Sequence, residues 1–226
     1  MRRFYQLMFF IGIFGVGCTQ SDTSALCVLA YEQIQDEEYE SARHTATQCL
    51  ENADGELKLM YQGYTYRAQA AFRLGEYDAA VSDQWAALEL DRSNYVDLVN
   101  YSLFLRFSGR GKESLDAIKK AQTLANKKNE PSMMIQYHLG WAYLDDGQLT
   151  RAVEEFTKGI PYQPDYPYVY YLRGLAYEGL GNSEAAREDF EMTEILLCKM
   201  ERAWRKGEGY LEAVSKLRSE GFPVRC

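Results

Sequence analysis

A spacing of small residues recurs along the chain with a period of about 34 residues, and it limits the possible fold more than any other feature. In three stretches a small residue is followed seven residues later by glycine, and five residues after that by alanine. Glycine favours a tight turn, and alanine lets two helices approach closely. The period therefore predicts stacked helix–turn–helix units, none of which buries its apolar face alone. The three sets are Ala68 with Gly75 and Ala80, Gly140 with Gly147 and Ala152, and Gly174 with Gly181 and Ala186.

Two further stretches follow the same phase less closely. One lies at residues 95–126, around Gly109, and the other at residues 25–51. The phase then advances by 38, 34, 38 and 34 residues along the chain. The longer steps place extra residues in two polar stretches, Asn52–Leu57 and Asn126–Pro131, which we expect to be loops.

These patterns resemble the tetratricopeptide repeat (TPR), a helix–turn–helix unit of about 34 residues. The resemblance covers residues 25–199 and implies an all-α solenoid of about five repeats, in which Phe156 and Phe190 fill the space between paired helices. Residues 200–226 carry apolar residues close to helical spacing, which predicts a C-terminal capping helix and a tail. The expected repeats lie near residues 25–51, 61–92, 95–126, 133–164 and 167–198.

Residues 1–17 have the features of a signal peptide. Arg2 and Arg3 precede an almost wholly apolar stretch from Phe4 to Val16. A membrane-spanning helix needs about 20 apolar residues, so this stretch is too short to be a confident span. We expect it to direct export and to be removed.

The end of this segment resembles a bacterial lipobox, in which the cysteine is lipidated and begins the mature chain. The residues concerned are Gly15-Val16-Gly17-Cys18, with Gly15 where leucine is usual. The resemblance implies lipidation at Cys18, a linker over residues 18–24 and, with Thr19 after the cysteine, transport to the periplasmic face of the outer membrane. Small residues at 15 and 17 also suit ordinary signal peptidase, which would yield a periplasmic or secreted protein without an anchor.

Four cysteines remain if Cys18 carries lipid, and an even number suits an oxidising periplasm. Cys27 and Cys49 lie on the two antiparallel helices of the first expected repeat, so a disulfide between them is geometrically plausible. Cys198 and Cys226 could join the tail to the last repeat. The alternative is four thiols at positions where cysteine replaces alanine.

The chain lacks the motifs of common enzymes. It has two histidines: His44 in a charged, solvated stretch, and His138 beside Tyr137, where packing in the interior is favoured over a role in a groove. Neither a nucleotide-binding glycine motif nor cysteine or histidine at metal-binding spacing is present, so we predict no enzyme, no cofactor and no metal. A net charge of -8 provides no large basic field, which disfavours nucleic-acid binding.

The TPR resemblance implies that the first helix of each repeat lines a concave face. The residues expected there are aromatic rather than charged, which favours an apolar or extended peptide or a partner helix. A clamp for a terminal carboxylate is disfavoured, because only Asn100 matches in kind, with Arg106 nearby. A terminal segment of the chain itself, or packing between repeats, could instead occupy these rings. The expected groove residues are Tyr31, Tyr66, Gln69, Asn100, Leu103, Tyr137, His138, Trp141, Tyr168 and Tyr171.

The resemblance implies a non-catalytic scaffold or adaptor lipoprotein that binds proteins in the periplasm. Two lipoprotein groups have this layout: pilotins that help to assemble type IV pilus secretins, and TPR adaptors that bring proteases or cell-wall hydrolases together. The residues do not choose between them. The alternative is a soluble periplasmic or secreted TPR protein that binds a peptide or a small ligand.

Overall fold

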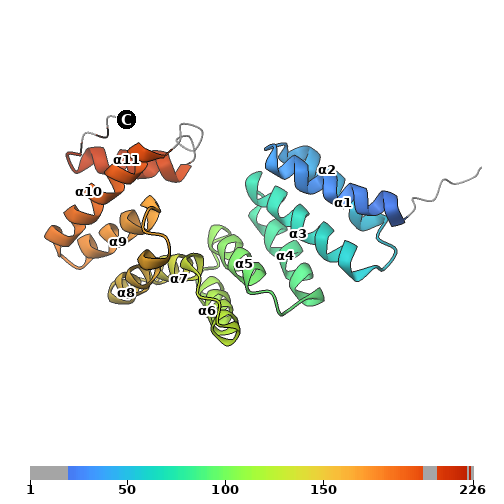
Figure 1. Cartoon of the computed structure of the whole chain (residues 1–226), viewed down its shortest axis with the longest axis horizontal. Coiled ribbons are helices and arrows are strands. Elements are labelled where there is room, and N and C mark those ends of the chain that lie inside the picture. Colours follow the sequence, from blue (N-terminus) through green and yellow to red (C-terminus); the bar gives the residue numbers. More distant parts are fainter. Residues whose placement is uncertain (1–19, 201–207, 223, 225–226) are drawn as a thin grey trace, which may run out of the picture.

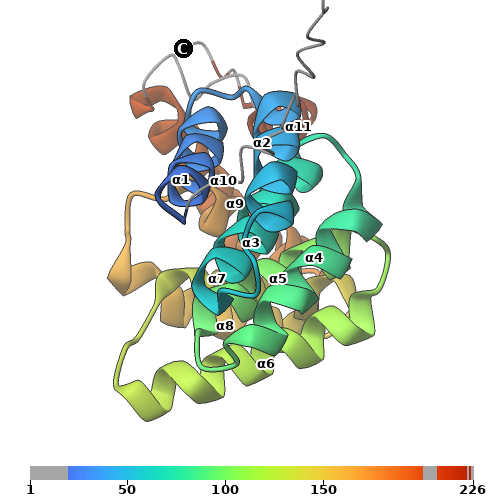
Figure 2. The same ribbon diagram turned by 90° about the vertical axis from the view of Figure 1, so that its right-hand side faces the viewer.

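The described part of the chain is a curved row of helices (Figure 1). The computed structural model describes residues 20–200, 208–222 and 224, and every regular element within them is helical. Seen along the row from the end formed by α1 and α2, later helices lie behind earlier ones (Figure 2). The all-α solenoid expected from the repeats is therefore confirmed. The helices are α1 (Gln20–Gln35), α2 (Tyr39–Glu51), α3 (Leu57–Arg73), α4 (Tyr77–Leu90), α5 (Tyr95–Phe107), α6 (Gly111–Lys128), α7 (Met133–Asp145), α8 (Leu149–Gly159), the 3₁₀ helix η1 (Ile160–Tyr162), α9 (Pro167–Gly179), α10 (Ser183–Lys199) and α11 (Glu208–Ser219).

The same tight turn joins the two helices of each of five units, α1–α2 to α9–α10. Its central residue has a left-handed backbone conformation, with φ between 62° and 79° in the five cases. The next residue donates its N–H to a carbonyl five positions back, as from Asn182 to Tyr177 at 2.9 Å. Glycine adopts this conformation without steric cost, and Glu37 takes its place in the first unit. The turn residues Glu37, Gly75, Gly109, Gly147 and Gly181 confirm the expected phase.

Small residues on the first helix of a unit make room for an aromatic ring from the second. A Cβ atom on Gly140 would lie 2.7 Å from the ring of Phe156, and one on Gly174 would lie 2.6 Å from the ring of Phe190. Both rings are buried. The expectation that Phe156 and Phe190 fill the space between paired helices is therefore confirmed.

One expected loop is shorter than predicted, because its first residues are helical and only the part after Lys128 is a loop. The stretch Asn126–Pro131 was predicted to be a loop, but α6 continues to Lys128 before Asn129, with φ 60°, ends it. The polar composition of the segment does not end the helix, because lysine is a good helix former and Lys127 and Lys128 lie in the last turn, where the helix dipole favours positive charge. The other expected loop is present between Glu51 and Leu57.

A disulfide joins α1 to α2. Cys27 and Cys49 are fully buried, and their Cα atoms are 5.3 Å apart. This is the pair that the antiparallel arrangement of the first repeat made plausible. Cys18 and Cys226 lie outside the described residues, as does the signal peptide at 1–17, so lipidation and the pairing of Cys198 with Cys226 stay predictions.

Helix α11 repeats the first half of a unit. It is followed by a left-handed residue, Gly221, and the N–H of Phe222 donates to the carbonyl of Leu217 at 2.9 Å, as in the five complete units. Val214 stands seven residues before this turn, where the complete units have a small residue, and it is buried. Val214 and Leu217 pack in the same apolar cluster as Phe190 and Leu197 of α10, so α11 covers the end of the α9–α10 pair.

Among the helices described, none is long and apolar enough to cross a bilayer.

Candidate functional site

The expected binding residues lie on the first helices of the five units. In the middle of the row, α5 and α7 are on the inside of the curve and α6 and α8 on the outside (Figure 1). We call the side formed by α1, α3, α5, α7 and α9 the inner face. Its residues fall into two groups that differ in exposure.

The first group, on α1, α3 and α5, is open to solvent. Tyr31 is 46% exposed, and its ring centroid lies 5.6 Å from that of Tyr66. Gln69, Asn100 and Leu103 are half-buried, as is Tyr66. Aromatic, amide and apolar side chains on this part of the inner face are thus at least partly accessible to a partner, with no charged side chain among these five.

Two further inner-face residues were not predicted. Val96 and Met134 are 49% and 41% exposed, and both stand at the repeat position that Tyr168 occupies in α9. Their spacing from the turn glycines Gly109 and Gly147 equals that of Tyr168 from Gly181, and this signal in the sequence would have found them.

The second group, on α7 and α9, is largely interior. Tyr137, His138 and Tyr171 are only 6%, 7% and 4% exposed, whereas Trp141 and Tyr168 are half-buried. The Tyr171 hydroxyl donates to Glu212 of α11 at 3.2 Å. The alternative that packing between repeats occupies these rings therefore holds for Tyr137, His138 and Tyr171.

Tyr166, in the segment before α9, completes this group and was missed by the sequence analysis. Its ring centroid is 5.3 Å from that of Tyr137 and 5.4 Å from that of Tyr168. Burial raises the pKa of Tyr166 to about 12 and that of Tyr137 well above its usual value. Both phenols are therefore neutral at physiological pH, as members of an interior cluster should be.

Arg106 closes the open side of this cluster. The centre of its guanidinium lies 3.4 Å from the centroid of the Trp141 ring, and its nitrogens donate to the carboxylate of Asp145. Because the guanidinium is held between a ring and a carboxylate, it is already occupied in this structure and does not form a free carboxylate clamp.

His138 is an interior histidine. Burial first, and then the nearby positive charge of Arg106, lower its pKa to about 4. It is therefore uncharged at neutral pH, and its pKa is poorly matched to proton transfer there. His44 is exposed on α2, far along the chain from this cluster, and lines a different cavity.

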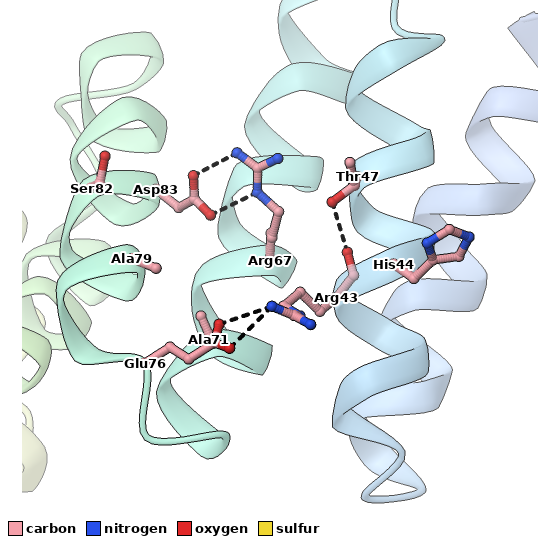
Figure 3. A pocket seen from close by; sticks show the side chains of 9 residues that line it. All are labelled: Arg43, His44, Thr47, Arg67, Ala71, Glu76, Ala79, Ser82 and Asp83. Atoms are coloured by element: carbon pink, nitrogen blue, oxygen red, sulfur yellow. Dashed lines mark hydrogen bonds and ion pairs between the residues drawn. The ribbon is translucent and has the colours of Figure 1, made fainter.

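That cavity lies between α2 and α4 (Figure 3). Its volume is about 420 Å³, and its charged groups are paired with one another. Arg43 donates to the carboxylate of Glu76 at 3.0 Å, and Arg67 donates to both oxygens of Asp83 at 2.7 Å. These pairs hold neighbouring helices together. An equivalent pair, Arg173 with Asp189, joins α9 to α10.

Within the described residues, no group of three or more histidine, cysteine, aspartate or glutamate side chains is arranged to hold a metal ion.

The fold defines the class of the protein as a TPR solenoid. The family model described as "TPR repeat" matches residues 140–181, from within α7 to the turn after α9. No curated protein sequence matches the chain significantly.

Solved TPR structures are similar to the whole array. PilW, described as a widely conserved type IV pilus biogenesis factor, is 18% identical with a TM-score of 0.68 over 90% of this chain and 94% of its own. YrrB, described as a TPR protein with an unusual peptide-binding site, is 18% identical with a TM-score of 0.61 over 87% and 94%. A MamA fragment from Desulfovibrio magneticus RS-1 is 17% identical with a TM-score of 0.67 over 81% and 99%. At these identities the similarity shows the fold alone.

Proposed function

We propose that this chain is a non-catalytic scaffold that binds a segment of a partner protein on the inner face of α1, α3 and α5. The observation that carries the proposal is that Tyr31 is exposed and Tyr66, Gln69, Asn100 and Leu103 are only half-buried, whereas Tyr137, His138 and Tyr171 of the second group are buried. Tyrosine rings give large contact areas at a low cost in side-chain entropy, and side-chain amides can pair with a peptide backbone. The partner segment is therefore apolar, and either extended or helical.

Similar structures support a scaffold role. One is a pilus biogenesis factor and another has an unusual peptide-binding site. Assembly of an envelope machine such as a type IV pilus, or regulation of cell-wall enzymes, fits a scaffold held at the membrane.

We further propose that Cys18 carries lipid and holds the chain on the periplasmic face of the outer membrane. The lipobox-like segment Gly15–Cys18 supports lipidation, and the buried Cys27–Cys49 disulfide supports an oxidising compartment. A lipoprotein carries several acyl chains, which makes release slow.

Mass spectrometry of the mature N-terminus tests the anchor. We expect an acylated Cys18, whereas a plain amine on that residue would rule out the anchor. The second candidate function would then stand, a periplasmic or secreted protein that binds a peptide or small ligand. It is favoured by the small residues Gly15 and Gly17, which also suit ordinary signal peptidase.

Site-specific photo-crosslinking in cells tests the binding face. A photoreactive residue at Gln69 or Asn100 should capture a discrete partner, and the same residue at Glu188, exposed on α10, is the matched control. The capture at position 69 should fall when Tyr31 and Tyr66 are both changed to alanine. Equal capture from positions 69 and 188 would mean that the inner face is not the docking surface.

A further inference from the structure

Helix α1 contributes to the inner face but buries few of its own side chains. Together with α2 it forms one end of the row, and it packs against α2 and α3 (Figure 1). Among its side chains that the structure describes, only Thr23, Cys27 and Ala30 are buried, whereas Val28 and Leu29 are exposed. A helix with so small a buried surface gains little from packing, so its place in the row needs another source of stability.

The aromatic ring that fills the space between paired helices in other units has no counterpart in the first unit. Phe156 and Phe190 stand nine residues after the left-handed turn residues of their units. Ala46 stands nine residues after the turn residue Glu37, and its side chain is a single methyl group. The contact between α1 and α2 therefore lacks the largest apolar side chain that joins the helices of units four and five.

The ion pair that joins paired helices elsewhere is also replaced. Arg173 and Asp189 stand eight residues before and eight residues after the turn residue of unit five, and they join α9 to α10. Leu29 and Thr45 occupy these two positions in the first unit, and they carry no charge. Neither the ring nor the ion pair thus holds α1 against α2.

The disulfide between Cys27 and Cys49 lies where three helices meet. It joins α1 to α2, and the sulfur of Cys49 lies 3.5 Å from the carbonyl oxygen of Leu59 on α3. The two cysteines and Leu59 belong to one buried apolar cluster, and the ring of Tyr66 packs against that cluster. The covalent bond therefore fixes α1 at the junction that also supports a residue of the binding face.

The second exposed ring of the binding face depends on the same bond. Tyr31 follows Cys27 by four residues on α1, and side chains four residues apart lie on the same side of a helix. The ring of Tyr31 contacts the ring of Tyr66, which α3 carries. Tyr31 can take part in the binding face only while α1 stays docked on α3.

We propose that closure of the Cys27–Cys49 disulfide completes the binding face of α1, α3 and α5, so that the chain binds its partner in the oxidised state alone. With two thiols, α1 detaches from α2 and α3 and carries Tyr31 away, and closure of the bond docks the helix again. This inference rests on the proposed function, because it concerns the regulation of that same face.

The bond closes by thiol–disulfide exchange. The two thiols give up two protons and two electrons to an oxidant that is itself a disulfide, and this oxidant leaves as a dithiol. Attack on the finished bond requires access to one of its sulfurs, and both cysteines are fully buried when α1 is docked. The docked helix thus shields the bond that docks it. The binding face is incomplete in a reducing compartment and stays complete after oxidation.

Hydrogen exchange tests the docking of α1 without any partner. The full chain is prepared with alanine at Cys18, Cys198 and Cys226, so that only Cys27 and Cys49 can pair. It is reduced in urea and refolded with reductant, or reoxidised with oxidised glutathione. Amides of α1 should exchange at least tenfold faster in the reduced chain, whereas amides of α9 should keep their rate.

Two results of this experiment would overturn the proposal. Equal exchange of α1 in the reduced and reoxidised chains would show that the helix stays docked without the bond. Equal acceleration of α1 and α9 would show that the bond supports the whole array and does not control one helix.

Photo-crosslinking from position 69 tests the effect on binding. Cys27→Ala with Cys49→Ala should lower capture of the partner at least tenfold, whereas the matched control, Cys198→Ala with Cys226→Ala, should leave capture unchanged. Equal capture by the two double variants would overturn the proposal. Failure of the parent chain to capture any partner would instead overturn the proposed function, and the exchange of α1 would still decide whether the disulfide docks this helix.

Discussion

The two halves of the inner face carry the same kinds of side chain in different states. On α1 and α3, Tyr31 is 46% exposed and touches one other ring, that of Tyr66. On α7, Tyr137 is 6% exposed and lies beside Trp141, Phe156 and Tyr166. Equivalent faces of successive repeats can thus either stay open to solvent or pack into the protein's own interior.

The difference comes from what lies beside each helix. The segment before α9 brings Tyr166 onto the rings of α7, and Arg106 covers Trp141 from α5. In the structure described, α11 covers Tyr171 through Glu212. An aromatic residue at an inner position therefore indicates binding only where no neighbouring segment has already covered it.

Replacing Tyr137 with alanine should produce the largest contrast between the halves. Removing a buried ring should lower the free energy of unfolding by about 4 kcal/mol. The same substitution at half-buried Tyr66 should cost about 1 kcal/mol. Urea denaturation measures both, and equal losses would contradict the division into an interior half and an open half.

Acidification should destabilise the interior half through His138. Its pKa is about 4 in the folded state, against 6.5 when unperturbed, so between those values only the unfolded chain binds the proton. The contribution of neutral His138 to the free energy of unfolding is fully present above pH 6.5. It is lost as the pH falls towards 4, by about 3 kcal/mol in total. Urea midpoints at pH 7 and pH 4.5 measure the loss.

The matched variants isolate this histidine from the carboxylates, which also titrate in that range. His138→Leu should show a smaller difference between the two pH values than the parent chain, whereas His44→Leu, at an exposed position, should match the parent. Equal pH dependence in all three chains would show that His138 is not a buried neutral group.

Removing the charge of Arg106 should have an intermediate effect. Arg106→Met keeps most of the side-chain length but removes the cation over Trp141 and the ion pair with Asp145, and should cost about 1 to 2 kcal/mol. Tryptophan fluorescence should also change as Trp141 gains solvent. A variant with parental stability and emission would place Arg106 outside the cluster.

The smallest effect on stability belongs to the open half. Tyr31→Ala should change the free energy of unfolding by less than about 0.5 kcal/mol, because exposed substitutions are usually near neutral. It should nevertheless weaken capture of the partner at position 69. A large loss of stability would mean that Tyr31 supports the fold and is not a binding residue.

Most of the fold followed from the sequence because the repeat sets local geometry. Gly75, Gly109, Gly147 and Gly181 marked the turns, and Ala80 and Ala152 marked the close helix contacts. The end of α6 was missed, since Lys127 and Lys128 are polar like loop residues but are also good helix formers.

The candidate site was less predictable than the fold. The repeat position of Tyr137 and Tyr171 places them on an inner face, but their burial depends on Tyr166 and α11, which lie outside the repeat pattern of those helices. The cavity lined by Trp85 of α4 and Leu98 of α5 was missed for a related reason. It depends on how units two and three pack together, which the spacing of residues within a unit does not determine.

The alternation of unit lengths has a consequence for how such a chain can grow or shrink. The left-handed turns at Glu37, Gly109 and Gly181 are separated by equal intervals of 72 residues, and so are those at Gly75 and Gly147. The natural module of this array is thus a block of two units and not one. Removing or duplicating a block of 72 residues between matching turns would keep the alternation of 38- and 34-residue steps. Removing a single unit would place two steps of the same length next to each other.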